Sequence, residues 1–289
     1  MTNTVNGLTQ GHATVKRTFV SLITVALTAA GLSAPVRPAL ADQDRSAPLV
    51  FQAAGPTAES IQGTVDAFRA ALGEPDNGNL PGPLAGGRRE INWDGGGGND
   101  TTTPPVTPFE VFLDSRGAQF VTPGTGLTQA PASGGVDGGL AILFNNPSYA
   151  TAFSAFSPLR LFSPVDSNVT EARFFLPGSN GGTPAAVTGF GAVFTDVDRL
   201  AGVSPTTNRP TQVALFDDQG NRLIRVTVPG SAGEGSLSFL GIVFDDARVA
   251  RVRITSGSRA PGPDDDAGND IVVMDDFLYG EPQLPYVPQ

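Results

Sequence analysis

The amino-acid sequence predicts an all-β fold: an antiparallel two-sheet β-sandwich with one N-terminal helix and long Gly/Pro-rich loops. Its apolar runs are short, closely spaced and not separated by helical patterns, which argues against a parallel α/β sheet. The 36 glycines and 25 prolines fall unevenly and punctuate these runs, as turn residues do between strands. A chain of 289 residues is also long enough to bury a core.

Residues 1–41 have the features of a signal peptide. A basic pair, Lys16-Arg17, precedes an apolar stretch over 19–34, and Ala39-Leu40-Ala41, with small residues at its first and last positions, precedes a polar segment. This order is typical of an export signal, and the apolar stretch is shorter than the roughly 18 to 20 residues that span hydrocarbon. We therefore expect cleavage and a secreted, extracellular product, or a periplasmic one if the host has an outer membrane. No membrane contact is expected after cleavage.

After residue 41 the chain contains no cysteine, histidine or lysine, since its only histidine is His12 and its only lysine is Lys16. This excludes Ser-His-Asp and Cys-His catalysis and histidine-ligated zinc in the mature chain. A nucleotide-binding phosphate loop is excluded as well, because it needs a lysine. Removing Lys16, Arg17 and Arg37 takes the formal net charge from −10 to −13. Such a charge repels phosphate backbones, so we expect no nucleic-acid partner, whereas divalent cations suit it.

One helix is predicted over about residues 57–72. Thr57 can cap it and Gly73 can end it. Apolar residues recur between them at helical spacing, at Ile61, Val65, Phe68 and Leu72. We expect this helix to brace the fold.

The rest of the chain favours strands. Arg251 and Arg253 alternate with apolar residues, which places the arginines on one wet face of a strand. The segment 216–221 reads as a hairpin turn in which Gly220 supplies a positive φ. The predicted strands cover residues 89–93, 109–113, 118–122, 140–144, 159–162, 169–176, 187–197, 211–216, 222–228, 237–244, 249–254 and 271–278.

We expect one sandwich domain over residues 88–282, between a flexible segment over 42–87 and a tail over 283–289. The Gly/Pro-rich stretch 77–108 is expected to be a mobile loop around one short ordered segment. Residues 88–144 either form a separate subdomain or supply strands to the same sandwich. The second arrangement is favoured because neither half closes alone.

Several runs carry a family resemblance: VTGFGAVFTDVD (187–198), QVALFDDQGNRL (212–223), LSFLGIVFDDARVARVRITSG (237–257), NDIVVMDDFLYGEP (269–282) and, upstream, RREINWDG (88–95). They resemble exported bacterial jelly-roll β-sandwich domains of the kind found in PEP-CTERM-associated proteins, which are similar to carbohydrate-binding modules. The resemblance implies a jelly-roll-like sandwich. The PEP motif and its terminal membrane helix are missing, so surface sorting by that route is not implied.

Calcium is the sharpest chemical hypothesis, because this ion takes roughly six to eight oxygen ligands and requires neither histidine nor cysteine. The resemblance implies a structural calcium beside an aspartate of the last strand, Asp275 or Asp276. We expect Asp196 and Asp198 to converge with that position. The acidic run 264–266 offers further oxygens on a loop, without the spacing of an EF-hand. The alternative is that these acidic segments are only solvated.

Binding of an extracellular polysaccharide is the leading functional hypothesis by resemblance. Sugar recognition commonly uses an aromatic platform with planar polar side chains beside it. The aromatic candidates are Trp93, Tyr149 and Tyr279, and the polar candidates are Arg251, Arg253 and Asn269. Each aromatic has a structural alternative, because large aromatic side chains are mostly buried.

Two other functions stay open from the sequence. The chain suits a structural or adhesive domain that contacts a surface or matrix protein. A glycoside-cleaving enzyme is a third possibility, since that reaction can run on two carboxylates alone. No spacing or motif marks a general acid, so we expect a non-catalytic protein.

Overall fold

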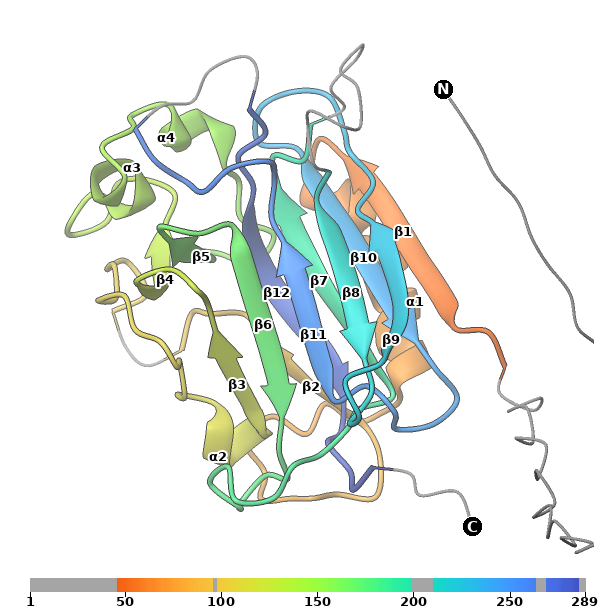
Figure 1. Cartoon of the computed structure of the whole chain (residues 1–289). Helices are drawn as coiled ribbons and strands as arrows, with labels where there is room; N and C mark the ends of the chain where they lie inside the picture. Colours follow the sequence, from red (N-terminus) through yellow and green to blue (C-terminus); the bar gives the residue numbers. More distant parts are fainter. Residues whose placement is uncertain (1–45, 96–97, 199–209, 264–268, 286–289) are drawn as a thin grey trace, which may run out of the picture. The chain divides into compact units, whose positions relative to one another are not determined.

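Two antiparallel sheets pack face to face around an aromatic core, which confirms the predicted all-β sandwich (Figure 1). The computed structural model describes residues 46–95, 98–198, 210–263 and 269–285. Strands make up 37% of the described residues and helices 13%, so the β elements determine the fold class. The predicted signal peptide, residues 1–41, lies outside the described residues.

The larger sheet has seven strands. Its order is β1-β10-β7-β12-β5-β4, and β2 also pairs with β12. These strands cover Leu49–Gly55 (β1), Arg88–Ile91 (β2), Gly126–Pro131 (β4), Arg160–Val165 (β5), Gly189–Thr195 (β7), Leu237–Val243 (β10) and Val273–Gly280 (β12). Every residue of β12 is buried, so both faces of this strand are covered.

The smaller sheet has five strands in the order β3-β6-β11-β8-β9 and turns one face to solvent. Val252 is fully buried whereas the Arg253 side chain is 49% exposed, so the predicted alternation along β11 is confirmed. The turn between β8 and β9 is also confirmed, with Gly220 at a φ of 83°. The strands cover Ala118–Val121 (β3), Val169–Phe174 (β6), Gln212–Phe216 (β8), Arg222–Thr227 (β9) and Arg251–Thr255 (β11).

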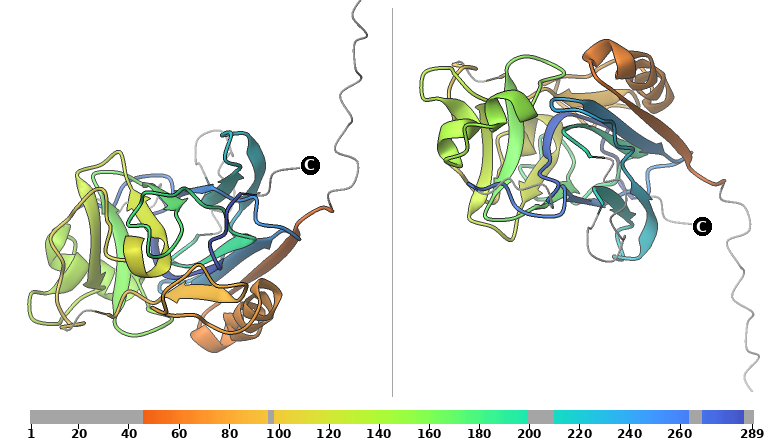
Figure 2. Two further views of the ribbon diagram at one scale, coloured as in Figure 1. Left: turned by 90° about the horizontal axis from the view of Figure 1, so that it is seen from below. Right: turned by 90° about the horizontal axis from the view of Figure 1, so that it is seen from above.

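Helix α1, Ala58–Leu72, packs on the outer face of the larger sheet (Figure 2). A reciprocal capping arrangement between Thr57 and Ser60 begins the helix. The four apolar residues predicted to share a face are all buried. Three short helices that the sequence did not predict accompany it: Leu113–Arg116 (α2), Gly139–Leu143 (α3) and Tyr149–Ala152 (α4).

Two glycines opposite one another let Phe68 of α1 reach the sheet backbone. Gly191 of β7 pairs with Gly241 of β10. A Cβ on Gly191 would lie 2.6 Å from Cε1 of Phe68, and a Cβ on Gly241 would lie 2.5 Å from its Cδ2. The ring meets Phe51 and Phe239 edge-on, with centroids 5.5 and 5.4 Å away. The ring therefore occupies the space of two missing side chains and fixes α1 on the sheet.

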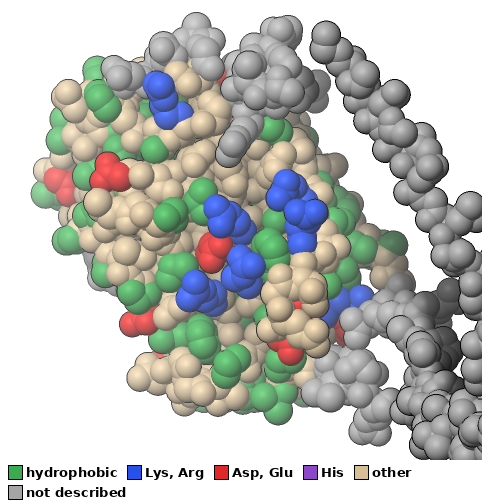
Figure 3. Space-filling model, viewed as in Figure 1, with side chains coloured by type: hydrophobic (Ala, Val, Ile, Leu, Met, Phe, Trp, Pro, Cys, Tyr) green, Lys and Arg blue, Asp and Glu red, His purple; other side chains and the backbone are tan. Residues whose placement is uncertain are grey.

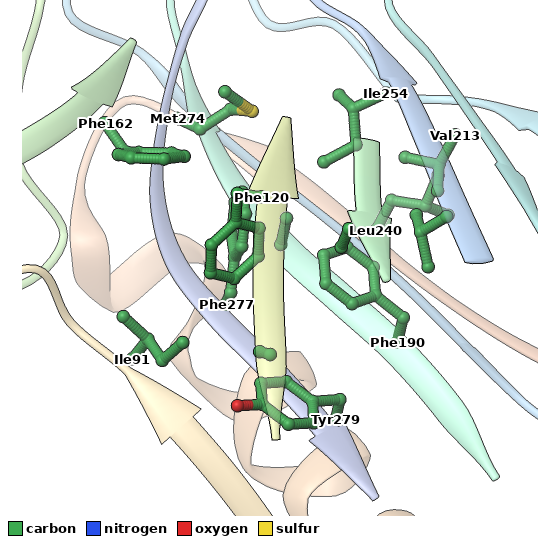
Figure 4. Close-up of a cluster of buried hydrophobic side chains, with 14 of the residues drawn as sticks. Ile91, Phe120, Phe162, Phe190, Val213, Leu240, Ile254, Met274, Phe277 and Tyr279 are labelled. Carbon is green, nitrogen blue, oxygen red and sulfur yellow. The ribbon is translucent and has the colours of Figure 1, made fainter. Parts of the chain in front are cut away.

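Trp93 lies at the centre of the core between the sheets. It is fully buried and stacks on Phe162 with ring centroids 3.7 Å apart. Phe120 and Phe277 approach it edge-on at 5.5 and 4.9 Å. The indole Nε1 donates a hydrogen bond of 3.0 Å to the carbonyl of Asp275. Figure 4 shows the rings from β3, β5 and β12 meeting in this region, so the cluster joins both sheets.

A buried ion pair holds the Gly/Pro-rich segment after α1 against the sandwich. Arg89 contacts Glu281 through bonds of 2.5 and 2.8 Å, and both side chains are buried. Glu281 also accepts from the Asn77 amide at 2.9 Å and from the Leu84 N–H at 3.0 Å. Arg89 donates to the carbonyl of Leu80 at 2.9 Å. The sequence predicts this segment as mobile loop, but these buried bonds attach it to the sheet.

A second ion-pair network ties α1 to β2. Arg69 donates to both carboxylate oxygens of Glu90, with its closest bond at 2.9 Å, and Nε of Arg88 lies 2.6 Å from the same carboxylate. Burial acts to raise the pKa of Glu90, but the two guanidinium groups outweigh it and hold that pKa below its ordinary value. The carboxylate therefore stays ionised and links the helix to the strand.

Two of the predicted strands are wrong. Residues 140–143 belong to α3 and Phe144 caps it. Leu140 and Phe144 are buried while Ile142 between them is 69% exposed, which is a helical spacing. In 109–113 only Phe109 makes a bridge, to Phe120, before the chain turns into α2. Short apolar runs do not distinguish helix from strand by periodicity alone.

Two strands lie where none was expected. Leu49–Gly55, in the segment expected to be flexible, pairs along its whole length with β10 as β1. Gly126–Pro131 pairs with β5 as β4. Residues 88–144 supply β2 and β4 to the larger sheet and β3 to the smaller one, so they contribute to one sandwich.

Replacing Gly241 with Ala should lower the free energy of unfolding by about 1 to 3 kcal/mol, because the new Cβ collides with the Phe68 ring. The matched control is Gly63→Ala in α1, where a Cβ meets nothing within 4 Å. That substitution should raise stability by up to about 1 kcal/mol. Urea denaturation of the two variants checks both signs, and an equal effect of the two would contradict the role of Phe68.

Candidate functional site

Five arginines gather on the solvent face of the smaller sheet, around one carboxylate (Figure 3). Alternate residues of a strand share a face, so neighbouring strands bring their long side chains to one surface. The face is positively charged although the whole chain carries a formal charge of −10. We call this surface the arginine face, and it comprises Glu171 and Arg173 of β6, Arg222 and Arg225 of β9, and Arg251 and Arg253 of β11.

The strand register arranges these residues in two rows across the sheet. Ala214 of β8 lies between Arg253 on one side and Arg225 on the other. With adjacent strands about 4.8 Å apart, the two arginine backbones stand roughly 10 Å apart with a small residue between them. The first row runs Glu171, Arg253, Ala214, Arg225, and the second runs Arg173, Arg251, Phe216, Arg222.

Glu171 pairs with three of the five arginines. Its Oε1 lies 2.9 Å from Nη1 of Arg251 and 3.3 Å from Nη1 of Arg253. Its Oε2 lies 3.6 Å from Arg173. The Arg251 guanidinium also lies over the Phe216 ring, 3.8 Å from its centroid. One carboxylate cannot neutralise three guanidinium groups, so the face keeps excess positive charge.

Arg222 and Arg225 of β9 form no ion pair with any residue that the structure describes. Both side chains are exposed. No described carboxylate neutralises their charge, which solvent ions therefore balance. An anionic ligand could replace those ions.

Two hollows adjoin at Arg253. The first has a volume of about 430 Å³, and Ala214 lies in it among longer neighbours, chiefly Gln212, Phe216, Arg225, Arg253 and Thr255. The second has a volume of about 360 Å³ on the other side of β11 and is lined by Val121, Val169, Glu171, Arg173 and Arg253 among others. The arginine face is thus hollowed on both sides of its central arginine.

No family model, curated protein or solved structure matches this chain. The function therefore has to be argued from the side chains themselves. Among the described helices, none is long and apolar enough to cross a membrane.

The predicted aromatic platform is wrong for all three candidates. Trp93, Tyr149 and Tyr279 are fully buried. The Tyr279 hydroxyl donates to the carbonyl of Arg116 at 3.2 Å, and the Tyr149 hydroxyl bonds to the backbone of Gly262 at 3.0 Å. Burial also raises the pKa of Tyr279. A buried ring cannot stack on a ligand, so these residues take the structural role that was the alternative.

The predicted polar partners divide between two places. Arg251 and Arg253 lie together on the arginine face, as neighbours of Glu171. Asn269 is partly exposed and lies on the chain leading into β12, outside the smaller sheet. The sequence did not single out Arg173, Arg225 or Glu171 for binding. The strands that carry these three residues were predicted. The sequence offered only one indication of their role, which was that each has a long charged side chain.

Two of the predicted calcium ligands are buried on β12. Asp275 accepts hydrogen bonds from the N–H groups of Phe156 and Ser157 at 2.6 and 3.3 Å. Asp276 accepts from the Ser157 hydroxyl at 2.6 Å. Burial raises the pKa of both carboxyl groups, and the charge of Asp276 raises that of Asp275 further. Their oxygens are bonded within the fold.

The other two predicted ligands follow β7. Asp198 is exposed, and its N–H donates to Oδ1 of Asp270 at 3.2 Å. Asp196 is partly exposed and has a φ of 66°. In the part of the chain that the structure describes, no three acidic side chains come close enough to hold a metal ion. The expected convergence of Asp196 and Asp198 with Asp275 and Asp276 is therefore not seen, and calcium stays a prediction from the resemblance.

Stability should fall with pH through the titration of Asp270. Burial raises its pKa from 3.8 to about 7, although the hydrogen bond from the Asp198 N–H acts to lower it. The folded chain then binds more protons than the unfolded chain between these two values. The contribution of this group is fully present below pH 4 and is lost as pH rises to about 7.

Asp270→Asn keeps an oxygen acceptor for the Asp198 N–H and removes this titration. Its free energy of unfolding, relative to the unmodified chain, should therefore rise by about 1 to 4 kcal/mol between pH 4 and pH 8. Denaturation curves across that range measure the difference. A difference that stays constant with pH would show that Asp270 does not titrate in this window.

Proposed function

We propose that this chain is a secreted, non-catalytic domain that binds an extracellular polysaccharide on the arginine face. The observation that carries the proposal is the hollowed, positively charged surface of the smaller sheet in an otherwise acidic chain. The resemblance to exported jelly-roll domains supports a carbohydrate ligand. The features of a signal peptide in residues 1–41 support an extracellular location.

The shape of the face suits a long ligand better than a small one. Small-molecule sites usually enclose most of their ligand in a concave pocket. Here two open hollows adjoin across the strands, at Arg253. Gln212 and Thr255 add hydrogen-bonding groups beside the guanidinium groups. A polymer lying across the strands can use both hollows, together with these donors.

The carboxylates are arranged poorly for glycoside cleavage, which needs two of them on either side of the scissile bond. Among the described residues that line the two hollows, Glu171 is the only carboxylate. The close pair Asp275 and Asp276 has 0% and 5% of its surface exposed, so a sugar chain cannot reach it. These facts support a binding domain without catalysis.

Residues 42–289 should be retained on at least one insoluble polysaccharide in a panel of neutral and acidic polymers. Arg253→Gln should weaken retention about tenfold or more, because a charge-assisted hydrogen bond is lost. The matched control is Arg259→Gln, which removes the same charge from the exposed loop between β11 and β12. Pull-downs in calcium and in EDTA measure retention, and loss in EDTA would tie calcium to binding.

Retention on no polymer would contradict the proposal. If sedimentation velocity then showed concentration-dependent association, the structural or adhesive role would replace it. Unchanged retention of Arg253→Gln would place binding outside the arginine face. Equal loss in Arg253→Gln and Arg259→Gln would show that retention depends on general charge alone.

A further inference from the structure

We propose that the hollow over Ala214 recognises the carboxylate groups of an acidic, uronate-containing polysaccharide, held between Arg225 and Arg253. This inference rests on the proposed function and names the chemical class of its ligand. It follows from three features of the described residues: the in-register arginine pair, the uncompensated charge, and the second hollow beyond Arg253.

The two arginines are placed to bind one anion from both sides. Arg253 and Arg225 come from strands on either side of β8, and each lies directly opposite Ala214. A larger residue at Ala214 would fill the first hollow, whose lining includes both arginines. Guanidinium groups present paired N–H donors that match the two oxygens of a carboxylate. The hollow therefore has donors on opposite walls and a small residue between them.

The neighbouring side chains keep Arg253 in this position. Glu171 accepts from its Nη1 at 3.3 Å, and Arg251 beside it is fixed by the same carboxylate at 2.9 Å and by the Phe216 ring. Arg225 has no carboxylate partner among the described residues. The pair flanking Ala214 thus carries more positive charge than the described residues neutralise.

The positive charge of the arginine face favours an acidic polymer over a neutral one. The arginine face has five arginines and one glutamate, while the formal charge of the whole chain is −10. Long-range attraction by the whole chain therefore cannot explain the binding of an anion, and the attraction has to come from this face. A neutral sugar would leave the charge of Arg225 unused.

The second hollow indicates a repeating ligand. The row from Arg225 through Arg253 to Glu171 continues to Val121 on β3. Four strand spacings make this row roughly 19 Å long, which spans several sugar rings. Arg173 and Arg253 both line the second hollow, so a polymer that crosses the strands can place a further carboxylate there.

The test compares polygalacturonate with its fully methyl-esterified form, which has the same backbone without the charge. Residues 42–289 should bind the acid form at least about tenfold more tightly than the ester, and added salt should weaken this binding. Arg225→Gln and Arg253→Gln should each lower the affinity about tenfold or more. Isothermal titration calorimetry measures the affinities, and circular dichroism with thermal melting checks that each variant is folded.

Three further variants separate a shaped site from general charge. Ala214→Leu keeps every charge but fills the hollow, and it should abolish binding. Glu171→Gln removes the competing carboxylate and should strengthen binding of the acid form, whereas a merely structural role would weaken it. Arg259→Gln, outside the smaller sheet, should leave the affinity unchanged.

The outcomes distinguish this inference from the proposed function. Equal binding of polygalacturonate and its ester would overturn carboxylate recognition and leave polysaccharide binding standing. Binding of no polysaccharide at all would overturn both. If dextran sulfate and single-stranded DNA bound as tightly as polygalacturonate, the face would be a general polyanion-binding surface, and the inference would also be overturned. Self-association that is lost in Arg225→Gln would show that a second acidic copy of the chain occupies the face.

Discussion

The architecture depends on the complete burial of β12. This strand pairs with β7, β5 and β2, and it lies between α1 and the smaller sheet. Asp275 and Asp276 lie at its irregularity between Met274 and Phe277 and are buried, and they accept hydrogen bonds from Ser157 and from backbone N–H groups. Buried carboxyl groups need such partners, because an unsatisfied one is costly. The two carboxyl groups therefore hold the segment of Phe156 and Ser157 against β12.

The buried and exposed charges follow different rules. The buried Arg89 and Glu281 are matched one to one, since an unpaired charge there would destabilise the fold strongly. On the smaller sheet, water screens each guanidinium group, so an excess costs little. Packing does not require five arginines on this face. The proposed binding of an anionic polysaccharide would account for this excess of positive charge, which folding tolerates without requiring it.

The sequence predicted secondary-structure elements better than it predicted which residues the fold brings together. Alternation along residues 251–254 and helical spacing in residues 57–72 report the local environment directly, and both are confirmed. The aromatic platform failed because a Trp or Tyr looks the same in sequence whether buried or exposed. Ala214 between Arg225 and Arg253 depends on the register of three strands. The sequence of a single strand does not determine how it pairs with its neighbours, so the arginine face could not be predicted from the sequence.

The position of β12 along the chain has a consequence for biogenesis. It is the last strand that the structure describes, yet it occupies the middle of the larger sheet. The bond from Trp93 to Asp275 joins residues 182 positions apart. A nascent chain that has not reached residue 280 lacks the strand on which β2, β5 and β7 assemble. The larger sheet therefore cannot assemble until nearly the whole of the described chain has been synthesised.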